Sequence, residues 1–447
     1  MKISDGFDFN QQISFFNDVH GESVSIHVIL HIMLKSKLFG PITFFLIFIG
    51  IDLYVWQGIK FLLRNASPSK IKKAKYIYWG YSIFMYLVFI AIRVIHVQPS
   101  SFLKFFGAVV LIIFIVKLIW VIFLLIDDLI RLFRWAFQYI TNKDMIQNTT
   151  NDGISRLKFL NYMALGLGAL FISSAVWGIF KGAHNYIVRR RTLKIDGLPE
   201  AFKGLKIVQI SDIHSGSFWD REAVKRGVAL IMNEKADMIF FTGDLVNDTS
   251  KEAEAWIDVF KEIKAPLGVF STLGNHDYGD YVQWETPEAK HQNFLDILQH
   301  HKSMGWDLLM DEHRIIEKDG DKIAILGIQN WSNLGKFPKY GNLEKAYEGT
   351  EDIPVKLLLS HDPTHWRQQV LNFKPDIKAS FAGHTHGLQF GVDTAFYRWS
   401  PAKFIYNEWM DLYTENNQHL YVNRGFGYLG YPGRMGIYPE ISVFTLV

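Results

Sequence analysis

The sequence predicts two parts, a bundle of four transmembrane helices followed by a layered α/β domain. Three observations lead to this fold class. Residues up to about 180 contain four apolar runs of 21 to 25 residues each. From about residue 196 onward, apolar runs of strand length alternate with amphipathic helical stretches, a pattern typical of layered α/β domains. Polar residues come directly after five of these short runs.

The composition limits the chemistry that the chain can carry out. Of 447 residues, 49% are hydrophobic and 20% are charged, which excludes a disordered or collagen-like chain. Cysteine is absent, so a metal ion would have to take nitrogen and oxygen ligands. The net charge of +3 is too small to indicate a nucleic-acid partner, and none is expected.

Each of the four long apolar runs can cross a hydrocarbon core of ~30 Å as a helix. We therefore predict spans at about 38–59, 76–97, 102–126 and 160–180. In the preceding segment 1–37, the apolar run 24–34 is too short to span and is expected at the membrane interface. Residues 181–195 are expected to form a linker to a domain at 196–447.

Basic residues near the ends of the spans predict the orientation of the helices. They cluster after the first and third spans, whereas residues 98–101 between the second and third spans contain none. Both basic connections should therefore face the cytoplasm, which places the domain at 196–447 outside. Basic residues also follow the last span, but long domains cross a membrane largely regardless of such charge. The basic residues used are Arg64, Lys70, Lys72, Lys73, Lys75, Arg131, Arg134, Lys143, Arg156 and Lys158.

Two charged residues, Asp52 and Lys117, fall inside predicted spans. At a rise of 1.5 Å per residue, both lie ~12–14 Å from the cytoplasmic end of their helices. Because an unpaired charge at that depth is costly, we predict that they form an ion pair. The alternative is a helix shifted along its axis until each charge reaches the interface.

The polar residues of the second part follow predicted strands at about 205–210, 238–241, 269–273, 355–359 and 377–381. Ligands of open α/β sheets bind at the carboxyl ends of the strands, so these side chains should converge. The residues are Asp212, His214, Asp244, Asn275, His276, His361, His384 and His386.

This set contains too many imidazoles and carboxylates for a Ser-His-Asp arrangement, and the sequence has no serine in a G-x-S-x-G turn. Crowded in one cleft, such groups would repel one another and lose solvation. Divalent cations relieve both problems. The mixture of nitrogen and oxygen ligands favours Mn, Fe or Zn over Ca or Mg.

In order and strand context, these motifs resemble the signature of the calcineurin-like metallophosphoesterases, from about residue 194 to the end of the chain. The resemblance implies a four-layer sandwich of two facing mixed sheets flanked by helices. It also implies two divalent metal ions. The implied ligands are Asp212, His214 and His386 for one ion, Asn275, His361 and His384 for the other, and Asp244 as the bridge.

The reaction implied by the resemblance is hydrolysis of a phosphate ester. Two cations ~3.5–4 Å apart lower the pKa of a bridging water, and the resulting hydroxide attacks the phosphorus in line. His276 resembles the general acid of the family, which protonates the leaving group. Where the family often has an aspartate to orient this ring, the chain has Asn247 and then Asp248. Either residue could orient it, and Asp248 is the candidate carboxylate.

Two features after the last motif bear on the substrate. Eight aromatic residues lie within 24 positions, which fits either ordinary packing or an apolar lip that admits a lipid from the bilayer. Arg424 and Arg434 lie in glycine-rich segments and could bind a phosphate or pair with an acidic neighbour. The aromatic residues are Phe390, Phe396, Tyr397, Trp399, Phe404, Tyr406, Trp409 and Tyr413.

The segment 155–160 resembles a degraded twin-arginine export signal, of the kind that precedes a group of exported or membrane-attached bacterial members of the family. It therefore favours a domain outside the cytoplasm, on a bacterial inner or plasma membrane. A simple basic flank on the cytoplasmic side is the alternative.

The leading prediction is a membrane-anchored, metal-dependent phosphoesterase, with lipid-linked esters among the candidate substrates. One alternative is a pyrophosphatase for a lipid precursor of the UDP-diacylglucosamine type, which would require a cytoplasmic site. Another is a membrane sensor or transporter whose phosphoesterase-like domain does not catalyse a reaction. The sequence leaves the oligomeric state open.

Overall fold

The computed structural model describes residues 39–94, 101–141, 155–335, 337–371 and 373–447. These residues form two compact units, one from 39–84 and 117–168, the other from 85–116 and 169–447. The expectation for the interfacial run 24–34 falls outside the described residues.

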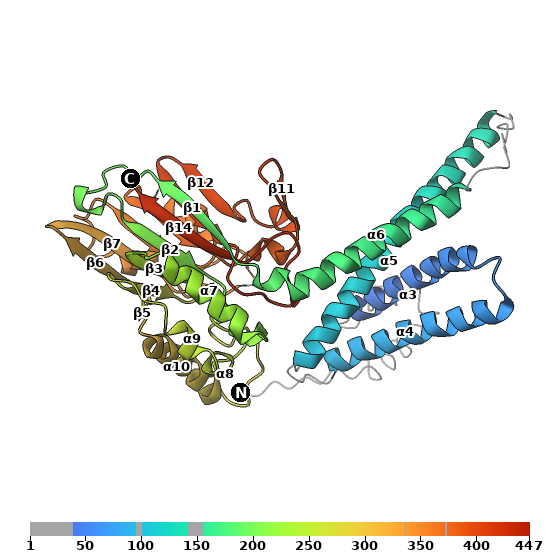
Figure 1. The fold of residues 1–447 in the computed structure, drawn as a ribbon, viewed down its shortest axis with the longest axis horizontal. Coiled ribbons are helices and arrows are strands. Elements are labelled where there is room, and N and C mark those ends of the chain that lie inside the picture. The colour runs from blue at the N-terminus through green and yellow to red at the C-terminus, as the bar shows by residue number, and fades with distance from the viewer. Residues whose placement is uncertain (1–38, 95–100, 142–154, 336, 372) are drawn as a thin grey trace, which may run out of the picture. The chain divides into compact units, whose positions relative to one another are not determined.

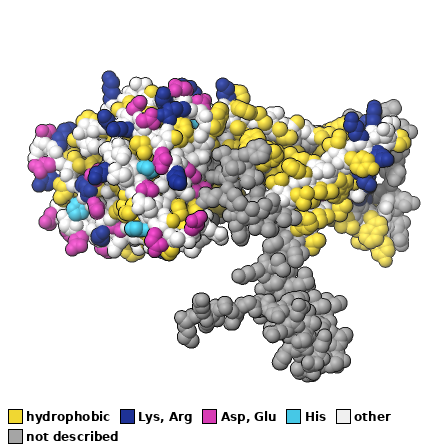
Figure 2. Space-filling model, turned by 90° about the horizontal axis from the view of Figure 1, so that it is seen from below, with side chains coloured by type: hydrophobic (Ala, Val, Ile, Leu, Met, Phe, Trp, Pro, Cys, Tyr) yellow, Lys and Arg dark blue, Asp and Glu magenta, His cyan; other side chains and the backbone are white. Residues whose placement is uncertain are grey.

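The first part of the chain forms four long helices, α3 (Phe39–Leu62), α4 (Pro68–Val94), α5 (Ser101–Thr141) and α6 (Arg156–Phe180). Three of them are long and apolar enough to cross a membrane, over 45–62, 105–141 and 156–184, when only the described residues are considered. The fourth, α4, begins with a lysine-rich turn. Figure 2 shows hydrophobic side chains covering much of the helical part, whereas charged side chains are scattered over the α/β domain.

Helix α5 is longer than the predicted span and extends over 41 residues to Thr141. Arg131 and Arg134 therefore lie on this helix, whereas the sequence alone predicts them in the connection after the third span. The extension continues because Asp127 accepts hydrogen bonds from Arg131, one turn later, and from Arg156, each at 2.6 Å. The lysines expected in the first connection similarly lie on the first turns of α4.

The predicted ion pair between Asp52 and Lys117 is confirmed. The Lys117 Nζ atom lies 2.5 Å from Asp52 Oδ1, and the carboxylate side chain is 2% exposed. Asp52 Oδ1 also accepts a hydrogen bond from Tyr78 Oη at 2.7 Å, and Lys117 donates to Ser82 Oγ at 3.1 Å. Both charges are thus compensated within the helical unit, as burial in an apolar environment requires.

The second part of the chain is built on two six-stranded mixed sheets (Figure 1). The first sheet has the order β1-β14-β2-β3-β4-β5, and the second has the order β12-β13-β9-β8-β7-β6. Strands β2, β3, β4 and β5 are parallel to one another, as are β7, β8, β9 and β13. The first sheet contains β1 (Ile187–Leu193), β2 (Lys206–Ile210), β3 (Met238–Thr242), β4 (Val269–Thr272), β5 (Asp307–Leu308) and β14 (Glu440–Leu446). The second contains β6 (Glu312–Lys318), β7 (Asp321–Gly327), β8 (Lys356–Leu359), β9 (Ile377–Ala382), β12 (Asp411–Glu415) and β13 (Gln418–Val422).

Successive side chains along each strand point to opposite faces of the sheet, so the core is divided into layers. On β3, Phe240 packs between the two sheets, whereas Phe241 packs on the outer side, beneath the helices α7 (Arg221–Asn233) and α10 (Pro287–Met304). The outer side of the second sheet is covered by α11 (Leu343–Tyr347) and neighbouring turns. Helices, sheet, sheet and helices form the four layers that the motif resemblance implied. Two short α-helices, α8 (Lys251–Glu254) and α9 (Ile257–Phe260), complete the helical layer on the first sheet.

The segment 181–195, expected to be a linker, contains the edge strand β1 of the first sheet. This strand pairs in parallel with β14 over its whole length, from Ile187 opposite Glu440 to Leu193 opposite Leu446. Its arginines are neutralised by carboxylates from other elements, since Arg191 donates to both oxygens of Asp411 at 2.8 and 3.0 Å. The basic residues of the expected linker therefore belong to a strand with acidic partners.

Candidate metal centre

All five predicted strands are present, within two residues at each end, and each is followed by its polar motif. Strands β2, β3 and β4 deliver Asp212, Asp244 and Asn275 from the first sheet. Strands β8 and β9 deliver His361, His384 and His386 from the second. The side chains delivered by the two sheets meet at one place.

The backbone turns sharply where these strands end. Asp212, His214, Asp244, His384 and His386 all have positive φ angles, between 48° and 70°. Residues other than glycine seldom adopt this left-handed conformation, and each such residue costs on the order of 1–3 kcal/mol. The surrounding fold therefore compensates for the strain and aims these side chains into the site.

Two glycines allow the strand ends to approach each other. A Cβ atom on Gly383 would collide with Asp212 Oδ2 and with the Oγ atom of Ser211. A Cβ atom on Gly274 would collide with Asp244 Oδ1. The glycines in the motifs thus do more than complete turns, because they let backbone pass directly beside two carboxylates.

The first group of ligands consists of Asp212, His214 and His386, whose nitrogen and oxygen ligand atoms all lie within 4.8 Å of one another. His386 Nε2 lies 3.2 Å from Asp212 Oδ1 and 3.0 Å from His214 Nε2. All three residues are buried. Two imidazoles and a carboxylate at these distances form a compact half-shell for one cation.

The second group consists of Asp244, His361 and His384, again within 4.8 Å. His361 Nε2 lies 3.1 Å from Asp244 Oδ2 and 3.2 Å from His384 Nδ1. The same Asp244 Oδ2 atom lies 3.5 Å from His214 Nε2, which belongs to the first group. Asp244 therefore faces both groups, which is the position that a bridging carboxylate needs.

Asn275 supplies a further oxygen. Its Nδ2 group donates a hydrogen bond to Tyr281 Oη at 2.8 Å, which fixes the amide. Its Oδ1 atom is buried without a hydrogen-bond partner. Because buried polar atoms are rarely left unpaired, this oxygen fits a metal ligand well.

Outer contacts orient three of the imidazoles. The Nδ1 atom of His214 lies 3.2 Å from the Val246 carbonyl oxygen, and the Nδ1 atom of His361 lies 2.7 Å from the Thr242 carbonyl oxygen. On His384, Nε2 lies 2.9 Å from Tyr406 Oη. In metal sites, such contacts fix the tautomer and leave the other ring nitrogen to the ion.

Burial keeps three histidines in the neutral form that binds metals. It lowers the pKa of His214 to about 3 and the pKa of His384 to about 4. Burial, with help from His214 and Arg434, lowers the pKa of His386 well below its ordinary value. Near neutral pH each of these rings is therefore uncharged and keeps one nitrogen lone pair.

His361 behaves in the opposite way. Burial alone would lower its pKa, but the carboxylates of Asp244 and Asp212 outweigh burial and raise the pKa to about 10. The His361 imidazolium in turn holds the pKa of Asp244 well below its usual range, against the effect of burial. The buried carboxylates of Asp244 and Asp212 therefore need a compensating positive charge. Two divalent cations would provide this charge in place of the proton on His361.

The general-acid candidate His276 lies at the edge of the centre. Its ring is partly exposed and lies 5.0 Å from the ring of His214, centroid to centroid. Its Nδ1 atom lies 2.5 Å from the carbonyl oxygen of Asn247, so the backbone orients the ring. A role for the carboxylate of Asp248 stays a prediction.

Sequence reasoning missed the structural part that Asp277 plays. This buried carboxylate accepts hydrogen bonds from the backbone nitrogens of Gly274, Asp244 and Leu245 at 2.8 to 2.9 Å. It joins the turns after β3 and β4, and thereby positions the bridge. Its place directly after His276 in the same motif was the signal that could have identified it.

Of the two arginines considered for phosphate binding, neither is exposed. Arg424 pairs with Glu440 and with Asp393, in agreement with the acidic-neighbour alternative. Arg434 donates to the carbonyl of Gly427, and its Nη2 group lies 3.1 Å from His386 Nδ1. The Arg424 guanidinium therefore stabilises the fold through its acidic partners. The Arg434 guanidinium contacts the ring nitrogen of His386 that faces away from the other ligands.

The aromatic residues after the last motif divide into two sets. Tyr406 and Trp409 are buried, as ordinary packing predicts, whereas Phe396 is 100% exposed and Phe404 is 75% exposed. Neither explanation therefore applies to the whole segment.

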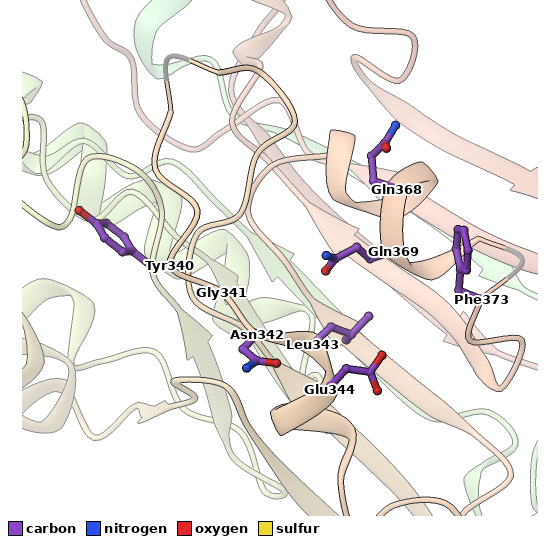
Figure 3. Close-up of a pocket in the computed structure, with 8 residues that line it drawn as sticks. All are labelled: Tyr340, Gly341, Asn342, Leu343, Glu344, Gln368, Gln369 and Phe373. Carbon is purple, nitrogen blue, oxygen red and sulfur yellow. The ribbon is translucent and has the colours of Figure 1, made fainter.

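A separate cavity of about 460 Å³ lies among residues around the start of α11 and the turn at Trp366–Val370 (Figure 3). None of its lining residues belongs to the two ligand groups. They are Tyr340, Gly341, Asn342, Leu343, Glu344, Gln368, Gln369 and Phe373.

Comparison with protein families gives two matches. Residues 37–183 match a family described as probable calcineurin-like phosphoesterase, transmembrane domain. Residues 205–388 match the family described as calcineurin-like phosphoesterase. The second match contains every residue of the two ligand groups.

Individual relatives agree with these matches. An uncharacterized metallophosphoesterase of Bacillus subtilis, YkuE, is 30% identical over 302 residues, which cover 66% of this chain and 98% of the relative. A transmembrane protein with metallophosphoesterase domain of Danio rerio is 30% identical over 288 residues, which cover 62% of each chain. Among solved structures, the NAD nucleotidase of Haemophilus influenzae is 18% identical with a TM-score of 0.35, over 50% of this chain and 45% of that one.

Proposed function

The chain belongs to the calcineurin-like metallophosphoesterase family, and from this premise we propose that it hydrolyses a lipid-linked phosphate ester at a centre of two divalent cations. The family makes it a phosphoester hydrolase, and the transmembrane match makes it a membrane protein. The observation that carries the proposal is the pair of ligand groups that share Asp244.

The donor set supports Mn, Fe or Zn as the cations. Four imidazoles, two carboxylates and the unpaired oxygen of Asn275 form a mixed shell that alkaline-earth ions do not favour. When bound, two such cations activate a water for attack and neutralise charge on the phosphoryl oxygens.

His276 is proposed to act as the general acid that protonates the leaving oxygen. Because its Nδ1 atom faces the Asn247 carbonyl, Nδ1 keeps its hydrogen, and the protonated ring therefore presents its second proton, on Nε2, to the leaving oxygen. The backbone nitrogen of His276 donates to Asp244 Oδ1 at 2.9 Å, which ties the position of the acid to the bridging carboxylate. An acid held in this way can protonate an alkoxide without moving its backbone.

A lipid-linked substrate is supported by the residues beside the second ligand group. Phe404 and Ile405 are 75% and 51% exposed, whereas the next residue, Tyr406, is buried with its hydroxyl 2.9 Å from His384 Nε2. One step along the chain thus leads from an exposed apolar surface to a tyrosine that contacts the candidate ligand His384. An acyl chain resting on Phe404 and Ile405 would place its phosphate near the cations.

The proposed orientation places the site outside the cytoplasm. The lysines at the start of α4, Arg131 and Arg134 of α5 and the basic residues at the start of α6 lie at or next to the two connections that the positive-inside rule assigns to the cytoplasm. Four crossings would then leave residue 181 and everything after it on the opposite side. A cytoplasmic lipid-precursor pyrophosphatase would require the reverse.

The proposal is tested with purified full-length protein in nanodiscs, supplied with Mn²⁺ and offered phospholipids, nucleotide-linked lipids and aryl phosphate esters. We expect turnover of a lipid-linked ester that disappears in the Asp244→Asn variant. The control Asp258→Asn removes a carboxylate that is 70% exposed and pairs with Arg221 on the surface, and it should retain turnover. Hydrolysis of aryl esters alone would keep the enzyme class and overturn the lipid-linked substrate. Protease digestion of intact cells then reports on which side the domain lies.

A further inference from the structure

A hairpin of the catalytic domain carries large apolar side chains on its surface. Its strands are β10 (Val392–Asp393) and β11 (Arg398–Trp399), which pair antiparallel. Phe396 at the tip is 100% exposed, and Tyr397 beside it is 59% exposed. Phe390 and Val392 on the approach are 36% and 42% exposed. In water, such a set of exposed side chains would be unfavourable, so it indicates a covering partner.

The hairpin is connected to helix α6. The ring of Phe390 contacts the ring of Phe171 on α6, with 6.2 Å between centroids, and on its other side it lies 6.3 Å from the ring of Trp399. Two further contacts follow along the same helix. Tyr431 donates from its hydroxyl to the carbonyl of Ala175, and the backbone nitrogen of Arg434 donates to the carbonyl of Gly178 at 3.1 Å. The domain therefore holds α6 from Phe171 to Gly178.

The depth of these contacts follows from the length of the span. A hydrocarbon core of ~30 Å takes about 20 helical residues at a rise of 1.5 Å each. Arg156 and Lys158 are charged, so the apolar stretch begins at Phe159 and its twentieth residue is Gly178. Lys181, which is exposed, follows at the other end. Phe171 then lies about 10 Å inside the boundary of the core.

Shifting the membrane-spanning stretch of α6 towards its amino end, far enough to take Phe171 out of the hydrocarbon core, is unfavourable. If the core ended at Leu170, so that Phe390 stayed in water, the twenty residues would begin at 151 and would include Arg156 and Lys158. Placing two cations inside the core costs several kcal/mol each on insertion scales. The contact with Phe171 is therefore made at the level of lipid.

We infer that the β10–β11 hairpin inserts into the lipid leaflet beside α6, with Phe396 and Tyr397 covered by lipid. The partner of this surface is the bilayer that α6 itself crosses. The inference holds whichever phosphate ester the site takes, so it goes beyond the proposed function. Insertion would fix the catalytic domain at the membrane surface through two attachments, the helix and the hairpin.

The absence of cysteine from the chain allows a direct test. A single cysteine at Phe396→Cys in the full-length protein is labelled with the polarity-sensitive dye NBD and reconstituted into phosphatidylglycerol–phosphatidylcholine vesicles. The control is Phe373→Cys, a residue that is 65% exposed and precedes β9 at its amino end, on the edge of the sheet opposite the metal ligands.

We expect doxyl-labelled lipid to quench the dye at position 396 at least about threefold more strongly than the dye at position 373, and aqueous iodide to show the reverse order. Equal quenching at both positions by iodide, with no effect of doxyl lipid at position 396, would overturn the inference. Neither outcome depends on hydrolysis, so a failure here is distinct from a failure of the proposed function.

Discussion

The Nε2 atoms of His214 and His386 lie 3.0 Å apart, although the two residues are separated by 172 positions in the sequence. Their other ring nitrogens assign the tautomers, because His214 Nδ1 faces a carbonyl oxygen and His386 Nδ1 faces the guanidinium of Arg434. His386 Nε2 then carries the hydrogen and donates it to His214. A cation at this position would replace one proton and satisfy both nitrogens, so the pair supports the proposed first metal site.

The role of His276 predicts a dependence on the leaving group. The His276→Ala variant should lose ~10²–10⁴-fold in kcat/KM for an alkyl phosphate ester, whose leaving oxygen needs a proton. For a 4-nitrophenyl ester the loss should be below about tenfold, because that anion leaves without help. The exposed His291→Ala serves as the control. Equal losses for both esters would rule out an acid role.

The close approach at Gly383 predicts that a single methyl group disrupts the site. In Gly383→Ala, the new Cβ collides with Asp212 Oδ2 and must displace this ligand. A ligand shift of about 1 Å costs ~10²-fold in rate, so turnover of an aryl ester should fall by this order. Gly335→Ala places its Cβ in open space and should retain activity. Full activity in Gly383→Ala would show that the carboxylate position is unimportant.

The ion pair in the helical unit predicts a rescue by charge exchange. Removing one partner, as in Asp52→Asn or Lys117→Met, leaves the other charge buried and should cost ~3–5 kcal/mol. Expression in membranes and thermal unfolding in nanodiscs measure this loss. The double exchange Asp52→Lys with Lys117→Asp should recover much of it, whereas exposed Lys73→Met should have little effect. A double variant no better than the single ones would argue that the two charges do not depend on each other.

Acid should destabilise the catalytic domain through His301, which lies far from the metal ligands in the sequence. Burial lowers its pKa in the folded chain to about 3, from an ordinary 6.5. Since the folded pKa is the lower one, the unfolded chain takes up the proton first, and stability is lost as the pH falls from about 6.5 towards 3. At pH 5 the loss from this residue is about 2 kcal/mol.

Thermal unfolding at pH 7 and pH 5 checks this expectation. The shift between the two pH values should be smaller in His301→Gln than in the wild type, because glutamine does not titrate. His291→Gln, at an exposed position, should leave the shift unchanged. An unchanged shift in His301→Gln would show that this histidine is not the titrating group.

The sequence could predict the strands and ligands because both are locally encoded. Each buried strand reads as a short apolar run, and Asp212, Asn275 and His384 follow such runs within three residues. What could not be predicted depends on distant partners. Strand β1 lies in the expected linker, and the acidic partners of its Arg189 and Arg191 lie more than 200 positions later, so nothing near the strand in the sequence indicates them. The Asn247 carbonyl that orients His276 belongs to the backbone, so the order of side chains in the sequence does not indicate it.

The length of α5 was underestimated for a related reason. Hydropathy marks where a span leaves the hydrocarbon, but not where its helix ends. Asp127 and Arg131 continue the helix by pairing one turn apart, and Arg156 from the next helix adds a second bond to the same carboxylate. The bond from Arg156 becomes visible only when the two helices are placed side by side.

The two ligand groups are proposed to hold two divalent cations. The most direct measurement is the metal content of the full-length protein, stripped with a chelator, titrated with Mn²⁺ and analysed by mass spectrometry of the elements. We predict two tightly bound ions per chain, a loss of at least one of them in His384→Ala, and recovery of ester hydrolysis in step with loading. Fewer than one bound ion per chain, together with hydrolysis that persists in the chelator, would contradict the account.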